Sequence, residues 1–172
     1  VFQHIVNLPG LFDQINFDNI QAVGVSTRPR NAQGSYMPCF LVGENTAFAV
    51  SKTNNVPLHK TSHQVGHILA ALYSTDLINL IYQPFIAFHL SGGTTEALLV
   101  KPDDTEIIKA NIMSKSLDLK AGQAIDRAGV MLGLQFPCGK QLDKLSQNSN
   151  KSYKVRPSMI GADCSLSGIE NK

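Results

Sequence analysis

The chain has 172 residues, of which 43% are hydrophobic and 16% charged, and these fractions predict a packed core rather than disorder. Its net charge of +2 is too close to neutral to indicate a nucleic-acid surface by itself. No apolar run approaches the ~18 residues of a membrane span, and the sequence from Val1 does not read as a signal peptide. We therefore expect a cytoplasmic protein with no membrane association.

Three cysteines, Cys39, Cys138 and Cys164, are widely spaced and form no CxxC pair. This spacing argues against a cysteine-based zinc site. We expect all three thiols to be reduced, as is usual in the cytosol.

The first part of the chain alternates between helix and strand patterns. A short helix is expected at 4–13, a β-branched strand at 20–27, a helix at 37–52, a strand at 56–62 and a helix at 63–74. This alternation predicts parallel strands with helical crossovers, and hence an α/β fold.

The second part reads differently. Three successive strands are expected at 84–93, 94–101 and 105–113, followed by helices at 120–132 and 140–147. The polar tail after residue 148 shows no clear element before residue 159.

The change of pattern near 74–84 predicts a division of the chain. We expect two α/β lobes, 1–78 and 79–172. The sequence contains no internal repeat and no low-complexity segment that would suggest a different organisation.

Two histidines four residues apart form the first candidate site. His63 and His67 share a face of the predicted helix, with about 6 Å between Cβ atoms, so both imidazoles can point at one metal ion. Gln64 stands where a zinc peptidase of the H-E-x-x-H type has its glutamate base, and a glutamine cannot take the proton. Gly66 costs roughly 1 kcal/mol relative to alanine inside a helix, which suggests close packing. The alternative is that both histidines are ordinary surface or core residues.

The stretch LSGGTTE, 90–96, runs from a strand into two glycines and several hydroxyl side chains. Such glycines let backbone N–H groups approach phosphate oxygens, although a plain hairpin turn would use the same residues. Arg28 and Arg30 follow the strand at 20–27 and suit phosphate, or they belong to a solvated loop.

The segment 117–140 contains a third candidate. Asp118, Gly122 and Asp126 are four residues apart, and an acid on that helix face could accept hydrogen bonds from ribose hydroxyls. Gly139 could again let the backbone approach a ligand. The alternatives are helix capping by Asp118 and a solvated face at Asp126.

The order of these motifs is more informative than any one of them. SHQVGHI, then PFIAFHLSGGTTEALLV, then DLKAGQAIDRAGVMLGLQFPCGK, then SLSG resembles the TsaD family, whose members are also called YgjD or Gcp proteins and were formerly described as O-sialoglycoprotein endopeptidases. The resemblance covers nearly the whole chain. The segments STRPR, GSYMP and DLKAGQ are similar to those of a divergent bacterial branch of this family.

The resemblance implies an actin/hexokinase-like fold of two ribonuclease-H-like lobes. It also implies metal-assisted transfer of a threonylcarbamoyl group from its adenylate to a tRNA adenosine. In the family, one iron or zinc ion is held by a histidine pair, matched here by His63 and His67, and by a later aspartate. The matching residues for substrate and nucleotide are Leu90, Ser91, Gly92, Gly93, Thr94, Asp126 and Gly139.

Three positions differ from the usual family residues. Thr94 replaces a histidine, and Val65 and Gln123 replace acids. These changes favour an alternative function, a non-catalytic paralogue that binds nucleotide or partner proteins as a scaffold. The retained histidine pair favours the enzyme, and a metallopeptidase is a third reading.

By the same resemblance, the chain corresponds to a central portion of such a protein. The family's opening strands would precede Val1, and its late asparagine and metal aspartate would follow Lys172. We expect this portion alone to be inactive, with its metal site empty, and an unpaired sheet edge to favour a homodimer. The expected partners are adenylate or ATP, tRNA and other subunits of the modification machinery.

Overall fold

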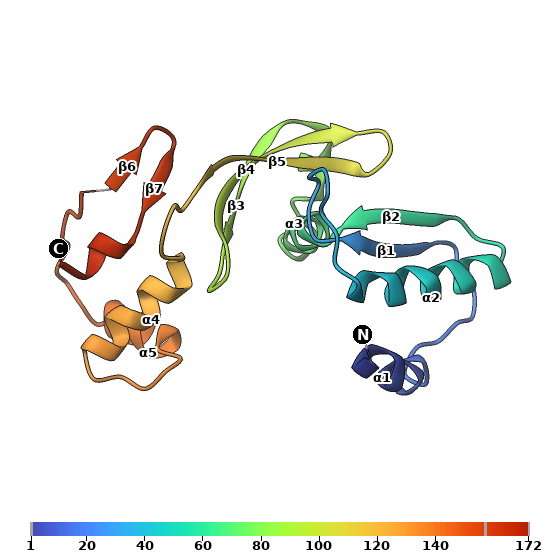
Figure 1. Cartoon of the computed structure of the whole chain (residues 1–172), viewed down its shortest axis with the longest axis horizontal. Coiled ribbons are helices and arrows are strands. Elements are labelled where there is room, and N and C mark those ends of the chain that lie inside the picture. The colour runs from blue at the N-terminus through green and yellow to red at the C-terminus, as the bar shows by residue number, and fades with distance from the viewer. Residues whose placement is uncertain (1, 157, 172) are drawn as a thin grey trace. The chain divides into compact units, whose positions relative to one another are not determined.

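The computed structural model describes residues 2–156 and 158–171 (Figure 1). No helix within these residues is long and apolar enough to cross a membrane. The chain divides into two compact units, Val1–Phe85 with Val100–Asn111 and Ile86–Leu99 with Ile112–Lys172. The predicted lobes, 1–78 and 79–172, stay a prediction, and the compact units differ from them at 79–85 and 100–111.

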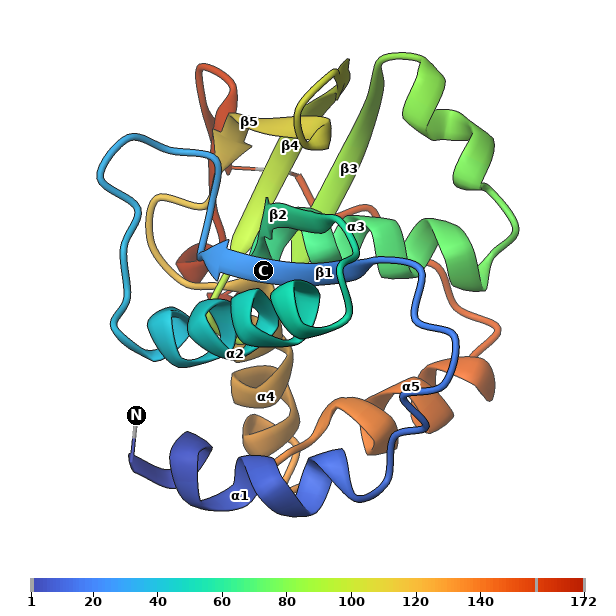
Figure 2. The ribbon, with the colours of Figure 1, turned by 90° about the vertical axis from the view of Figure 1, so that its right-hand side faces the viewer.

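The first unit is built on two parallel strands joined through a helix. β1 (Val23–Arg28) pairs with β2 (Leu58–Ser62), and α2 (Cys39–Thr53) connects them. Figure 2 shows α2 running along β1. This β–α–β arrangement confirms the α/β class and the parallel pairing predicted from the sequence.

Two further helices complete this part of the chain. α1 (Phe2–Phe12) precedes β1, and α3 (His63–Ser74) begins directly where β2 ends. Both confirm predicted helices. A short 3-10 helix, η1 (Ile78–Tyr82), follows α3 and was not predicted.

One face of α3 enters the core of the first unit. Val65, Ile68 and Leu72 are buried, at the i, i+3 and i+7 spacing of a single helix face. His63 and His67 lie on the exposed part of the same helix. Burial of the apolar face therefore fixes which way the histidine pair points.

The three strands predicted in the middle of the chain form one sheet, in the order β3 (Phe85–Leu90), β4 (Thr95–Asp103) and β5 (Ile107–Lys115). Leu98 and Ile108, one on β4 and one on β5, are fully buried. Both β4 and β5 contribute residues to each compact unit.

Two helices of the second unit pack closely through a glycine. α4 (Ala121–Met131) and α5 (Gly139–Gln147) confirm the predicted pair. A Cβ atom on Gly129 of α4 would lie 2.2 Å from the Cβ of Cys138, so only glycine fits there. Cys138 is fully buried, and this burial, helped by the charge of Asp126, raises the pKa of its thiol.

The tail forms a small hairpin that the sequence analysis did not predict. β6 (Ser158–Ile160) pairs antiparallel with β7 (Asp163–Ser165), and η2 (Ser167–Asn171) follows. Gly161 between the strands has φ 62°, a conformation that glycine adopts without strain.

Asp118 fastens this tail to the segment before α4. Its carboxylate accepts hydrogen bonds from the Leu119 N–H (2.6 Å), the Leu166 N–H (2.8 Å) and both the N–H (3.3 Å) and hydroxyl (2.5 Å) of Ser167. These bonds, that of the Ser167 hydroxyl first, hold the pKa of Asp118 well below its usual range.

Two helical glycines face very different neighbours, and this difference predicts opposite effects of alanine. A Cβ on Gly66 would lie 3.5 Å from Ser26 Oγ, an ordinary contact, so the close packing suggested from the sequence is not required. A Cβ on Gly122 would lie 2.7 Å from the backbone nitrogen of Gly92. We expect Gly66→Ala to stabilise the chain by about 0.5–1 kcal/mol and Gly122→Ala to destabilise it by about 1–3 kcal/mol.

Urea unfolding followed by circular dichroism checks both variants against the wild type. Because the same methyl group is added to a helix in each case, the two variants control for helix propensity. A Gly122→Ala variant as stable as Gly66→Ala would contradict the close backbone approach.

The depressed pKa of Asp118 predicts an acid-sensitive tail. The folded pKa lies below the unfolded value of about 3.9, so the stabilising contribution is complete above that pH and is lost as the pH falls further. We expect the Leu166 and Ser167 amides to lose hydrogen-exchange protection below about pH 4 in the wild type. Asp118→Asn should have weaker protection at neutral pH and little change on acidification. An equally acid-sensitive Asn variant would rule out this carboxylate as the cause.

Candidate functional site

The histidine pair lies at the start of α3. Ser62 is the N-cap, and its hydroxyl oxygen accepts a hydrogen bond from the Val65 N–H at 3.2 Å. His63 and His67 then stand one turn apart, with ring centroids 4.3 Å apart in an edge-to-face arrangement. The ring of Phe40 lies 6.0 Å from that of His63. The predicted convergence of the two imidazoles is therefore present.

The geometry of the pair is compatible with a shared metal ion. The two Nε2 atoms are 3.0 Å apart. Two nitrogen ligands at 2.0–2.1 Å from a tetrahedral zinc ion would be separated by roughly 3.3 Å, so small ring rotations would suffice. Within residues 2–156 and 158–171, no group of three or more His, Cys, Asp or Glu side chains is placed to hold a metal. The pair fits two ligand positions of such an ion.

Gln64, between the histidines, points the other way. Its side chain is buried, with only 3% of the residue exposed, whereas both histidines are exposed. A peptidase base would have to reach the same solvent-facing side as the metal. The structure thus adds an orientation argument to the chemical argument against a peptidase.

In the second unit, the loop between β3 and β4 is a tight turn organised by Ser91. The Ser91 hydroxyl oxygen accepts hydrogen bonds from the N–H groups of Gly93 (3.2 Å) and Thr94 (2.9 Å), and the Ser91 N–H donates to the Thr94 carbonyl at 2.7 Å. Gly92 and Gly93 are exposed, and a Cβ on either would meet nothing within 4 Å. The loop therefore presents open backbone at its two glycines.

This loop is joined directly to the first turn of α4. The Thr95 hydroxyl accepts from the Ala121 N–H at 2.8 Å, and the Ser91 carbonyl accepts from the Gly122 N–H at 3.1 Å. Both are N–H groups that a helix start leaves without an internal partner. Absence of a side chain on Gly122 lets the backbone of Gly92 come this close. The loop is therefore a hairpin turn whose position is fixed by hydrogen bonds to the start of α4.

Asp126 lies one turn further along α4 and holds the start of α5. Its Oδ1 accepts a hydrogen bond from the Cys138 N–H at 2.8 Å. A pocket of about 440 Å³ is lined by Gly122, Ile125, Asp126, Pro137, Gly139 and Lys140. The structure thus brings Asp126 of α4 and Gly139 of α5, both predicted to bind nucleotide, to one pocket.

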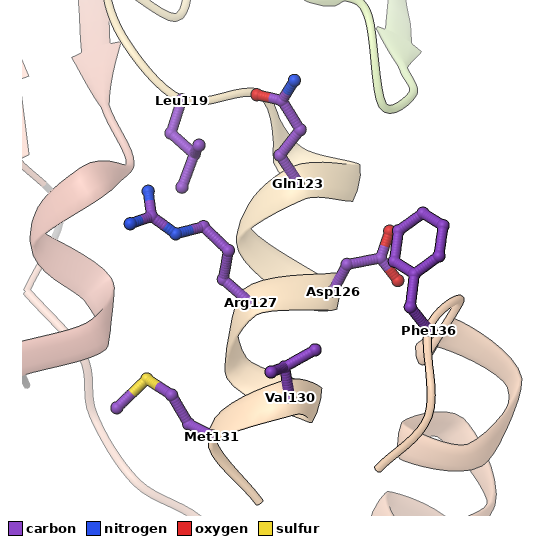
Figure 3. Close-up of a pocket in the computed structure, with 7 residues that line it drawn as sticks. All are labelled: Leu119, Gln123, Asp126, Arg127, Val130, Met131 and Phe136. Atoms are coloured by element: carbon purple, nitrogen blue, oxygen red, sulfur yellow. The ribbon is translucent and has the colours of Figure 1, made fainter. Parts of the chain in front are cut away.

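A second pocket, of about 580 Å³, is also lined by Asp126 (Figure 3). Its lining consists of Leu119, Gln123, Asp126, Arg127, Val130, Met131 and Phe136. Figure 3 shows Asp126 directed toward the segment that carries Phe136. As a residue, Phe136 is 74% exposed in this mostly apolar surface. Asp126 is the acid common to both pockets.

Two sequence interpretations need correction. Asp118 does not join Asp126 on a helix face, because α4 begins only at Ala121 and the carboxylate of Asp118 is bound to the tail. Arg28, considered for phosphate, instead has its Nη2 2.5 Å from Glu106 Oε1. Competition from this carboxylate argues against a phosphate role for Arg28.

The sequence analysis missed Glu106 and Ser62. Ser62 carried a usable signal, since a serine directly before a helical pattern is a typical N-cap. No local pattern in the sequence pointed to Glu106, because its partners Arg28 and Asn31 are more than seventy positions away in the chain.

Comparison with known proteins identifies the family. The family model described as TsaD, tRNA N6-adenosine threonylcarbamoyltransferase, matches residues 5–172. A relative of that name from Thermosipho africanus is 34% identical over 164 residues, which cover 91% of this chain and 46% of the relative. A relative of the same name from Ligilactobacillus salivarius is 30% identical, over 91% of this chain and 43% of the relative. One from Christiangramia forsetii is 31% identical, over 88% of this chain and 44% of the relative.

The chain spans slightly less than half the length of these curated relatives. Its mixed helices and sheets agree with the actin/hexokinase-like fold class predicted from the resemblance. The family match extends over the histidine pair, the Ser91–Thr94 turn and the α4–α5 pocket alike. The chain belongs to the TsaD family, the family of tRNA N6-adenosine threonylcarbamoyltransferases.

Proposed function

We propose that the protein containing this chain transfers a threonylcarbamoyl group from its adenylate to an adenosine of tRNA. The observation that carries this proposal is the assembly of the predicted nucleotide-binding residues in the second unit. The Ser91–Thr94 turn is bonded to the start of α4, and Asp126 and Gly139 line one pocket beside Gly122. A nucleotide site needs this combination of open backbone and one directed acid.

Each part of this pocket has a distinct role in the proposal. Asp126 would accept a hydrogen bond from a ribose hydroxyl with the oxygen that the Cys138 N–H does not use. Gly139 leaves open space, since a Cβ there would meet nothing within 4 Å. Leu90 and the glycines of the turn would lie along the phosphate side of the adenylate.

The histidine pair would hold one iron or zinc ion in the intact protein. When bound, such an ion supplies Lewis acidity to the carbonyl that the tRNA amine attacks. His63 and His67 would contribute neutral imidazoles through Nε2. The helix face buried by Val65 keeps both rings directed outward, where a substrate can reach them.

The unusual residues have structural explanations that leave the transferase as the best-supported function. Val65 is fully buried, so its side chain is a core contact. Gln123 still accepts a hydrogen bond from the Lys120 N–H (3.2 Å) at the start of α4, as an acid would. Thr94 closes the Ser91 turn through its backbone.

The partners belong to the same proposal. Adenylate or ATP would occupy the pocket at Asp126, and tRNA would supply the accepting amine in the cytoplasm. Because the net charge of this chain is only +2, local basic patches or other subunits would supply the positive charge that holds the tRNA. A homodimer through an exposed sheet edge stays a prediction, which light scattering can check.

Asp126→Asn tests the nucleotide pocket. Asparagine keeps an oxygen for the Cys138 N–H but loses the charge, so a bond from a ribose hydroxyl weakens. We expect the Kd of the chain for AMP, measured by calorimetry, to rise about tenfold or more.

Asp104→Asn is the matched control, because Asp104 is exposed and does not line the pockets that contain Asp126 or Gly139. It should leave the Kd for AMP unchanged. Equal Kd values for AMP in the wild type and Asp126→Asn would contradict a role of Asp126 in nucleotide binding.

His63→Ala and His67→Ala test the metal role. Each removes one of two neighbouring nitrogen ligands, so we expect iron or zinc content in the purified intact protein to fall from near stoichiometric to a minor fraction. Threonylcarbamoyl transfer to tRNA should fall with it. Elemental analysis and a tRNA modification assay measure the two effects.

His59→Ala provides the comparison, since His59 is an exposed histidine on β2 outside the pair. Its metal content and activity should match the wild type. An intact protein that binds nucleotide but never metal would instead support the scaffold reading.

A further inference from the structure

The turn between β4 and β5 is held in an unusual conformation by several contacts. Asp103 Oδ1 accepts hydrogen bonds from the N–H groups of Thr105 (3.0 Å) and Glu106 (2.9 Å), and its Oδ2 lies 2.7 Å from Lys109 Nζ. Ile107 has φ 70°, a region that β-branched residues rarely adopt. Such strain persists only where neighbouring contacts impose it. These contacts fix the direction of Glu106.

Glu106 uses both carboxylate oxygens within the first unit. Oε1 lies 2.5 Å from Arg28 Nη2, and Oε2 accepts a hydrogen bond from Asn31 Nδ2 at 2.9 Å. Its side chain is only 15% exposed. Charge-assisted bonds of this kind, mostly shielded from water, are stronger and more directional than exposed ones.

The contacts continue from Asn31 to the beginning of α3. The Ser62 hydroxyl donates to Asn31 Oδ1 at 3.2 Å and accepts from the Val65 N–H at 3.2 Å. Ser62 is fully buried. Since a hydroxyl has one proton, donating it to Asn31 leaves the oxygen lone pairs for the Val65 amide. Asn31 thereby orients the cap of the helix.

His63 is the residue that follows this cap. Its ring position depends on the first turn of α3, whereas His67 belongs to the second turn. The two Nε2 atoms are 3.0 Å apart, and loosening of the first turn would change that separation. Gln64, also in the first turn, donates its N–H to the Pro29 carbonyl at 3.0 Å, so the loop after β1 holds this turn at two points.

We propose that Glu106 is a positioning residue for the histidine pair, acting through Asn31 and Ser62 on the first turn of α3. The inference rests on the proposed metal role of His63 and His67. Glu106 touches neither metal nor substrate; its part is to hold Asn31 in the orientation that receives the Ser62 proton.

Hydrogen exchange of the Val65 amide tests the relay without any metal. In Asn31→Ala and Glu106→Ala we expect this amide to exchange about threefold to tenfold faster than in the wild type, because Ser62 loses its orienting partner. Glu44→Ala is the matched control. It removes another paired glutamate of the first unit, the partner of Lys60, and should leave Val65 unchanged.

Cobalt titration of the intact protein tests the consequence for the site. The Kd for Co²⁺ should rise about tenfold in Asn31→Ala and Glu106→Ala, and change less in Glu106→Gln, which keeps an oxygen for the Asn31 amide. Glu44→Ala should bind Co²⁺ as the wild type does. Circular dichroism establishes that each variant is folded at the temperature used.

The outcomes separate this inference from the proposed function. Unchanged Val65 exchange in Asn31→Ala overturns the relay, and so does an equal acceleration of Val65 exchange in Glu44→Ala. Faster exchange with unchanged cobalt affinity overturns the positioning role. A wild-type protein that binds no cobalt counts against the metal role itself, while the Val65 exchange still decides whether Glu106 and Asn31 hold the first turn.

Discussion

The free amides at the start of two helices are the constraint on which both candidate sites depend. A helix start leaves N–H groups without internal partners, and each must be satisfied from outside. In α3 the Ser62 hydroxyl meets the Val65 amide, and in α4 the Thr95 hydroxyl meets that of Ala121. The residues that satisfy these amides also fix where each helix begins. The position of the histidine pair and that of the pocket at Asp126 follow from this.

Polar contacts between distant segments then hold these helix starts in place. Glu106 binds Arg28 and Asn31, and Asp118 binds Leu166 and Ser167. In both cases one carboxylate accepts hydrogen bonds from more than one distant residue. Such contacts orient loops that have little apolar surface of their own. Packing alone would leave the segments around both sites less well defined.

The proposed function would place distinct demands on the two units. An adenylate would need a pocket with an acid and open backbone, and α4, α5 and the Ser91 turn offer these features. A metal-assisted attack would need imidazoles directed to solvent, and burial of Val65, Ile68 and Leu72 directs the histidines of α3 that way. Gln64 is buried on the same helix, and the peptidase reading therefore fails on orientation as well as on chemistry.

The sequence by itself determined the longer helices and strands and the two motifs. Apolar periodicity predicted α3, the three strands and the α4–α5 pair, and the i, i+4 spacing predicted that His63 and His67 converge. The contacts that depend on distant segments required the tertiary structure. The partners of Glu106 and Asp118 lie 48 to 78 positions away, and the approach of Gly92 to Gly122 depends on how a loop meets a helix. Local patterns encode which face of an element is apolar, but they do not encode which distant segment supplies its polar partners.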